Sequence, residues 1–147
     1  MKQLAILAIP AAVAATLAGA SPAYAGTCPA MGNFDMSNAP SAPVGVTDEV
    51  LSTVDLGPEI GVDGRQLRTR RLVVQPGGVV PMHSHVDRPA LIITISGSIT
   101  EYRSNCSSPI THNAGEISRE AEGISHYWIN NGSEPAVLLS SDVFHAM

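Results

Sequence analysis

Two runs of sequence decide the fold of this 147-residue chain. The first is GGVVPMHSH, residues 77–85, and the second is GEISREAEGISHYWIN, residues 115–130. Side chains two apart on a β-strand point to the same face, so His83 and His85 can bind one ion as a pair. His126 lies in the second run, which is again strand-like. A barrel or sandwich would bring it opposite the pair as a third ligand.

The spacing of these residues resembles the two signature motifs of the cupin superfamily. The glycine and histidine positions of the first motif are occupied by Gly77, His83, His85 and Gly97. The glycine, histidine and asparagine positions of the second motif are occupied by Gly115, Gly123, His126 and Asn130. Two positions depart, because Ala90 replaces the glutamate of the first motif and Ala121 the proline of the second. The resemblance covers roughly residues 50–146 and implies an all-β fold, the cupin double-stranded β-helix or jelly-roll barrel.

Residues 1–25 are predicted to be a secretory signal peptide. Lys2 is followed by an apolar run, and Ala23-Tyr24-Ala25 is a small-x-small cleavage signal. The alternative is a membrane anchor, but the apolar run is short and no positive stop follows it. We therefore expect an exported protein, periplasmic or secreted, with no membrane association after cleavage. Residues 26–48 are expected to form an irregular arm, and 49–147 the cupin barrel domain.

Composition limits the partners. The formal net charge is −5, and no basic run is present to attract nucleic acid. The two cysteines, Cys28 and Cys106, would both meet an oxidising compartment, which favours one disulfide over two free thiols. We expect that bond to join the arm to the loop around residues 103–109.

Short apolar runs separated by turn signals predict the strands. They cover residues 50–56, 66–74, 79–85, 90–96, 99–102, 110–112, 125–130 and 136–144. The run 90–96 is apolar on both faces, whereas a strand with one wet face should alternate. Its outer face should be covered by a second layer of the domain or by another subunit, and since cupins commonly dimerise we expect a homodimer.

Three histidines predict a divalent transition metal without choosing one, since imidazole suits several. Iron is favoured, with Mn, Zn, Cu or Ni as alternatives. The absence of the motif glutamate would leave positions open for water, dioxygen or substrate. Asp87 has the parity to replace that carboxylate, although it can also be a turn residue, and Glu101 is a weaker candidate. The remaining residues expected around the metal form a largely apolar pocket: Pro81, Ile92, Thr94, Tyr102 and Trp128.

Two functions stay open. The first is an exported metal-dependent cupin enzyme, dioxygenase-like, that acts on a small organic substrate. Three-histidine iron sites are known among cupin-like dioxygenases, which is what the resemblance implies here. The second is a non-catalytic module that binds a small ligand or a metal. No assured general base lies outside the ligand set, which weakens isomerase and hydrolase functions more than an oxygenase.

Overall fold

A computed structural model describes residues 28–146, and the predicted signal peptide lies outside this range. The described chain is nearly all β. Its elements in chain order are β1 (Val44–Asp55), α1 (Leu56–Ile60), β2 (Arg65–Ser84), β3 (Ala90–Ser96), β4 (Ser98–Arg103), β5 (Ile110–Asn113), β6 (Ile117–Glu120), β7 (Ser125–Ile129) and β8 (Ala136–His145).

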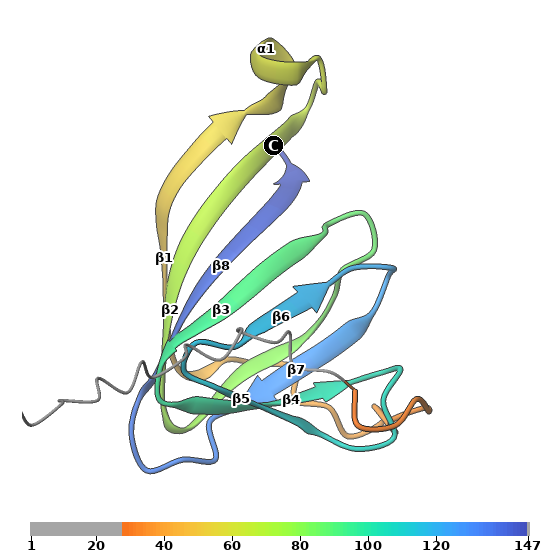
Figure 1. The fold of residues 1–147 in the computed structure, drawn as a ribbon, viewed down its shortest axis with the longest axis vertical. Coiled ribbons are helices and arrows are strands. Elements are labelled where there is room, and N and C mark those ends of the chain that lie inside the picture. Colours follow the sequence, from red (N-terminus) through yellow and green to blue (C-terminus); the bar gives the residue numbers. More distant parts are fainter. Residues whose placement is uncertain (1–27, 147) are drawn as a thin grey trace, which may run out of the picture.

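The strands form one strongly curved sheet that closes into a nearly complete barrel (Figure 1). Their order is β5-β4-β7-β2-β8-β3-β6, with β1 added beside β2, and each described pairing is antiparallel. The upper parts of β1, β2 and β8 rise beyond the barrel and carry α1 at the tip (Figure 1). The predicted all-β cupin barrel is confirmed.

Strand β2 links the two halves of the barrel. Its first half pairs with β8, and its second half pairs with β7. The bend between the halves falls at Gly77 and Gly78. Gly77 has a φ of 72°, and a Cβ on Gly78 would lie 2.7 Å from the carbonyl oxygen of Gln75. The strand can therefore turn from one side of the barrel to the other only where side chains are absent.

The core lies inside the barrel, and its buried members are Leu72, Val74, Ile92, Ile99, Trp128, Ala136 and Leu138. Strand β3 shows how the two faces differ. Ala90, Ile92 and Thr94 are buried, whereas Leu91 and Ile95 on the outer face are 57% and 47% exposed. No second layer of the described chain covers that face, so the outer side of β3 exposes apolar side chains.

The segment before β1 runs over the barrel and is held by the predicted disulfide. Cys28 and Cys106 are bonded, with their Cα atoms 5.5 Å apart. Met31 forms an isolated bridge with Cys106, and Phe34 packs edge-on against Tyr102 with ring centroids 5.6 Å apart. Within residues 28–146, no helix has the length and apolar character needed to cross a membrane.

The observed elements differ from the predicted ones in four places. Strand β1 begins at Val44, so the end of the predicted arm pairs with β2. The runs 66–74 and 79–85 form one bent strand. The short strand β6 was not predicted, because its alternation covers only four residues. Helix α1 was also missed, since five residues cannot show a helical period; its start is set by Asp55, which accepts a hydrogen bond from Gly57 N.

Candidate metal centre

Three histidines converge inside the barrel. His83 and His85 lie near the end of β2 and just beyond it, and His126 on β7 is paired in register with His83. The Nε2 atom of His83 lies 3.2 Å from that of His85 and 3.0 Å from that of His126. His126 and His85 are buried, whereas His83 is partly exposed. Antiparallel pairing thus brings together residues that are 43 positions apart.

The other ring nitrogen of each histidine decides where its proton sits. Nδ1 of His83 lies 2.8 Å from the carbonyl oxygen of Pro81, and Nδ1 of His85 lies 2.7 Å from that of Arg88. Nδ1 of His126 lies 2.7 Å from Oε1 of Glu101. Carbonyl and carboxylate oxygens only accept, so Nδ1 of His83 and Nδ1 of His85 carry the proton and donate. Nδ1 of His126 faces both the Glu101 carboxylate and, at 3.0 Å, the indole N–H of Trp128; we assign it the proton because the contact with the carboxylate is the shorter one. The three Nε2 atoms then carry lone pairs that face one another, which is the donor set of a cation.

Burial keeps two of these rings neutral. Burial and, to a smaller extent, the neighbouring His126 together lower the pKa of His83 to about 3. Burial also lowers the pKa of His85 to about 4, against the hydrogen bond to the Arg88 carbonyl, which raises it. Both histidines are therefore uncharged at neutral pH. This is the form that binds a metal ion.

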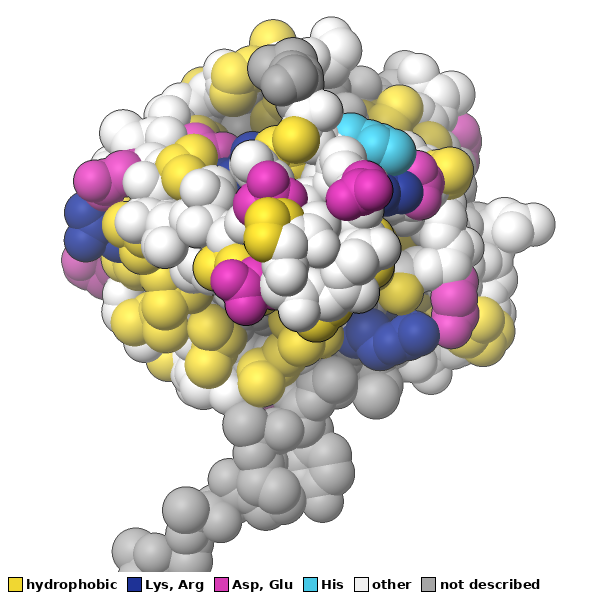
Figure 2. Space-filling view, turned by 90° about the horizontal axis from the view of Figure 1, so that it is seen from above, with side chains coloured by type: hydrophobic (Ala, Val, Ile, Leu, Met, Phe, Trp, Pro, Cys, Tyr) yellow, Lys and Arg dark blue, Asp and Glu magenta, His cyan; other side chains and the backbone are white. Residues whose placement is uncertain are grey.

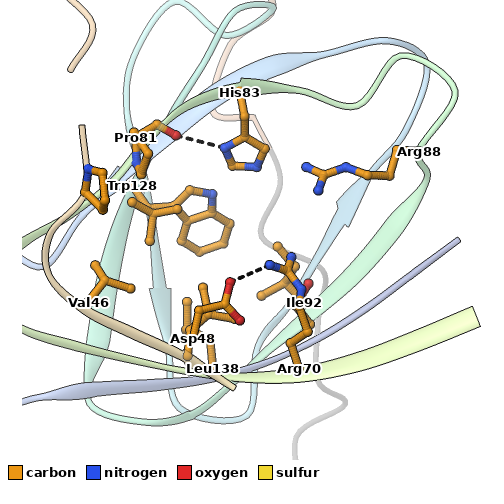
Figure 3. Close-up of a pocket in the computed structure, with 13 residues that line it drawn as sticks. Val46, Asp48, Arg70, Pro81, His83, Arg88, Ile92, Trp128 and Leu138 are labelled. Atoms are coloured by element: carbon orange, nitrogen blue, oxygen red, sulfur yellow. Dashed lines mark hydrogen bonds and ion pairs between the residues drawn. The ribbon is translucent and has the colours of Figure 1, made fainter. Parts of the chain in front are cut away.

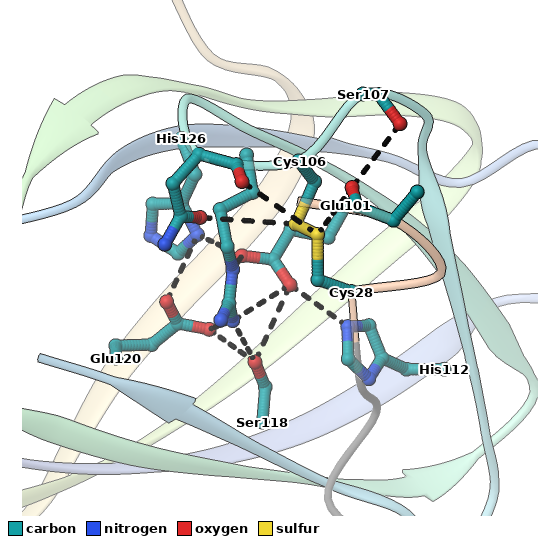
Figure 4. The surroundings of a disulfide bond; sticks show 11 residues. Cys28, Glu101, Cys106, Ser107, His112, Ser118, Glu120 and His126 are labelled. Carbon is teal, nitrogen blue, oxygen red and sulfur yellow. Dashed lines mark hydrogen bonds and ion pairs between the residues drawn. A yellow bond between two sulfur atoms is a disulfide. The ribbon is translucent and has the colours of Figure 1, made fainter. Parts of the chain in front are cut away.

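Glu101 on β4 stands behind His126 and is completely buried (Figure 4). Besides accepting from His126, it accepts from Nε2 of His112 at 2.9 Å and from Nε and Nη2 of Arg103 at 2.7 and 3.0 Å. Burial alone would raise the pKa of Glu101, but the hydrogen bonds from His112, His126 and Arg103 outweigh it and lower the pKa. The carboxylate is therefore ionised and holds His126 in one orientation.

A second carboxylate, Glu120, completes this buried network. Arg103 Nη2 donates to Glu120 Oε1 at 3.0 Å and to Ser118 Oγ at 2.7 Å, and Ser118 bonds Glu120 in turn. Burial raises the pKa of Glu120, and the charge of Glu101 adds to this effect. One guanidinium thus faces two carboxylates, and Glu120 is the harder of the two to ionise.

An apolar cavity of about 370 Å³ opens beside the histidines (Figure 3). His83 lines it, so the cluster meets the cavity through this residue. Trp128 and Ile92 form part of its wall, as does Pro81. Two guanidinium groups, those of Arg70 and Arg88, also line it. Of the residues expected around the metal, Pro81, Ile92 and Trp128 line this cavity.

Other expected site residues lie elsewhere. Asp87 is not brought to the histidines: it occupies a turn with a φ of 58°, is exposed, and bonds Arg65 and His145. Thr94 is buried on the inward face of β3 but does not line the cavity.

Tyr102 was expected in the pocket, but it does not line the cavity. It pairs with Tyr127, whose side chain points away from His126 and Trp128, and the two tyrosine rings stack 4.6 Å apart.

The residues that face inward from β4 are instead Ile99, Glu101 and Arg103, which share one face. Sequence reasoning ranked Glu101 low and left out Arg103, since charged residues usually face water. One signal was available. Ile99 has the same parity as both, so an inward isoleucine implied that the two charged residues face inward as well.

Comparison with known proteins agrees with this geometry. The sequence model of the cupin domain family matches residues 70–142. Auxin-binding protein ABP19b of Prunus persica is 31% identical over 84 residues, which are 55% of this chain and 40% of that protein. Germin-like protein 1 of Brassica napus is 33% identical over 81 residues, 53% of this chain and 39% of that protein. The chain spans about two fifths of the length of these curated relatives.

Solved structures share the fold. Oxalate oxidase in complex with the substrate analogue glycolate superposes with a TM-score of 0.53 at 20% identity, over 72% of this chain and 57% of that one. A predicted oxalate decarboxylase from Thermotoga maritima superposes with a TM-score of 0.55 at 15% identity, over 76% of this chain and 97% of that one. The sequence match, the barrel and the paired motifs agree, and the chain is a cupin-domain protein.

Proposed function

We propose that this protein is an exported cupin that binds one divalent transition metal through His83, His85 and His126 and acts, as a dioxygenase-like enzyme, on a small organic substrate. The observation that carries the proposal is the convergence of three Nε2 lone pairs while every Nδ1 is engaged by an acceptor. Without a cation these lone pairs repel, and with one they become ligands. Iron is our first choice of metal.

The chain's own residues do three things at this site. Three acceptors take hydrogen bonds from the Nδ1–H groups: the carbonyl oxygens of Pro81 and Arg88 and the carboxylate of Glu101. These bonds keep the three Nε2 atoms aimed at one point. Trp128 and Ile92 supply an apolar wall that excludes water from part of the cavity. A divalent transition metal supplies Lewis acidity there and, when redox-active, electrons for chemistry with dioxygen.

The absence of a ligand carboxylate favours catalysis over simple storage of a metal. Ala90 faces inward where the motif has glutamate but cannot coordinate. Three protein ligands leave coordination positions for substrate and dioxygen. The alternative is a non-catalytic module that binds a small ligand or a metal, and the same cavity beside the histidines supports it.

Metal analysis separates these functions. We expect mature protein purified after native export to contain about one equivalent of iron per chain, measured by mass spectrometry, and to consume oxygen with a subset of small organic substrates. Zinc at one equivalent with no oxygen consumption would favour the binding module. Protein that takes up no divalent metal at all would contradict the metal site itself.

We further propose a homodimer that covers the outer face of β2, β3 and β8. Leu67, Leu91 and Ile95 are 41%, 57% and 47% exposed there. Figure 2, which views the molecule from the α1 end, shows hydrophobic side chains gathered on one side of the surface. An exposed apolar patch of this kind is typical of an interface.

Light scattering tests the dimer. We expect wild-type protein to have the mass of two chains and Leu91→Glu to have the mass of one, because the charge would be buried in the interface. Val62→Glu, at an exposed residue beyond α1, is the matched control and should remain dimeric. A monomeric wild-type protein would overturn the proposal.

Export is proposed on two grounds. The N-terminal sequence has the layout of a signal peptide. The Cys28–Cys106 disulfide is of the kind that persists in the periplasm or outside the cell. A reducing compartment such as the cytosol would disfavour that bond.

A further inference from the structure

The cavity beside His83 contains a guanidinium group without a hydrogen-bond partner. Arg88 lies in the turn between β2 and β3, and Figure 3 shows its side chain pointing into the cavity toward His83. Its side chain is only 27% exposed. Among the described residues its side chain has only one ion-pair contact, from Nη1 to Oδ2 of Asp142, and at 3.6 Å this is too long for a hydrogen bond. A guanidinium that is partly removed from water normally forms such bonds.

The neighbouring carboxylates are already held by other arginines. Asp142 is 1% exposed and is bonded at both oxygens by Arg68, at 3.0 and 2.8 Å. Asp48 pairs with Arg70 at 2.6 Å. Three guanidinium groups therefore face two carboxylates, and Nε of Arg70 is also buried without a partner. The wall near Arg88 has one positive charge in excess, before any metal is added.

Most of the remaining lining is apolar, and its other polar members are Asp48, Arg70, His83 and Ser140. Its other walls include Trp128, Ile92, Leu72 and Leu138. The backbone of Arg88 also contacts the metal centre, because its carbonyl oxygen accepts the Nδ1 proton of His85 at 2.7 Å. An anionic group on the Arg88 side chain would therefore lie on the same side of the cavity as the histidines, with the apolar walls beyond it.

We infer that the cavity takes an amphipathic monocarboxylate, a small molecule whose carboxylate pairs with Arg88 and whose apolar body packs against Trp128 and Ile92. The inference rests on the proposed function for the role of the metal, and it narrows the substrate class. A planar guanidinium matches the two oxygens of a carboxylate, and the low-dielectric wall strengthens the pair. A small dicarboxylate such as oxalate has no apolar body to place against these walls.

Calorimetric titration of zinc-loaded mature protein tests this inference, with benzoate and its uncharged analogue benzamide as probes. We expect benzoate to bind wild-type protein at least about tenfold more tightly than benzamide, as a charge-assisted hydrogen bond allows. Arg88→Gln should remove that difference by weakening benzoate about tenfold or more while leaving benzamide unchanged. Arg88→Lys, which keeps the charge but loses the planar fork, should fall between the two.

Arg119→Gln is the matched control. Arg119 is exposed and pairs with Glu122 at 2.9 Å, outside the cavity, so this variant removes the same charge and should bind both probes as wild type does. Three results would overturn the inference: wild-type protein that binds no benzoate at millimolar concentration, equal losses for benzoate and benzamide in Arg88→Gln, or oxalate binding as tight as that of benzoate.

Zinc content, measured on the same samples, keeps the two proposals apart. If the protein retains zinc but binds benzoate independently of Arg88, the metal site is supported and the monocarboxylate inference is wrong. If the protein takes up no zinc yet binds benzoate in an Arg88-dependent manner, the monocarboxylate inference is supported and the proposed metal centre is wrong.

Discussion

Replacing His83 by alanine is expected to abolish stoichiometric metal binding. The change removes one of three converging Nε2 donors. The metal affinity should fall by more than the roughly 10–100-fold that loss of an outer hydrogen-bond partner costs. His83 is also the ligand that lines the cavity, and its described side-chain partners are Pro81 and the other two histidines. The fold should therefore survive its loss. Metal content by mass spectrometry and affinity by competition with a chelator measure the effect.

His145→Ala is the control for this experiment. His145 is exposed and bonds Asp87, away from the three histidines. It should keep a full equivalent of metal, so a loss in both variants would point to nonspecific binding by surface histidines. If His83→Ala keeps a full equivalent with wild-type affinity, the three-histidine centre is disproved.

Replacing Glu101 is expected to have the second large effect, on both stability and metal binding. In Glu101→Ala the donors Arg103, His112 and His126 lose their shared acceptor inside the barrel. Breaking a buried ion pair from one side costs about 3–5 kcal/mol of unfolding free energy. Arg103 keeps its bond to Glu120, which places the expected loss toward the lower end of that range. Denaturant unfolding, followed by circular dichroism, measures it.

Glu101→Gln separates the charge from the shape. The amide oxygen can still accept from His126, so the fold should be perturbed less than by alanine. The negative charge behind the histidine is lost, however, and we expect metal affinity to fall about 10–100-fold. Glu122→Gln, at an exposed residue paired with Arg119, is the control and should match wild type. Wild-type metal affinity in Glu101→Gln would show that this carboxylate does not tune the site.

The network around Glu101 also bears on the missing motif glutamate. With Ala90 at the motif position, a metal bound by the three histidines would have no carboxylate ligand from that position. Glu101 supplies a negative charge behind His126 instead, because its carboxylate accepts a hydrogen bond from Nδ1 of that histidine. Arg103 offsets part of that charge. A metal bound by these histidines would therefore be more electrophilic than one with a carboxylate ligand, yet less so than three neutral imidazoles alone would make it.

Much of the fold followed from local patterns. Period-two alternation and turn residues indicated the strands, and Gly77-Gly78 marked the bend of β2. The spacing of His83 and His85 ensured that both face one way, because alternation along a strand is a local property. The pairing of Cys28 with Cys106 was predicted from having two cysteines in a chain that is expected to be exported.

The errors came from relations between strands. Alternation tells which residues of β4 share a face, but not which face looks inward. That choice depends on register, which places Tyr102 opposite Tyr127 and Arg103 opposite His126. Composition favoured the wrong answer, since a tyrosine is a more usual inward residue than Glu101 or Arg103. The two charges are tolerated inside only because they neutralise and hydrogen-bond each other.

By itself, therefore, the sequence determined the barrel, the disulfide and the identity of three histidines that could meet. The tertiary structure decided everything that depends on contacts across strands. It turned Asp87 outward to Arg65 and His145. It placed Glu101 behind His126 and left Arg88 at the cavity without a short partner. The physical reason is that side-chain direction is local to a strand, whereas the partner that satisfies a buried charge is supplied by a strand far away in the chain.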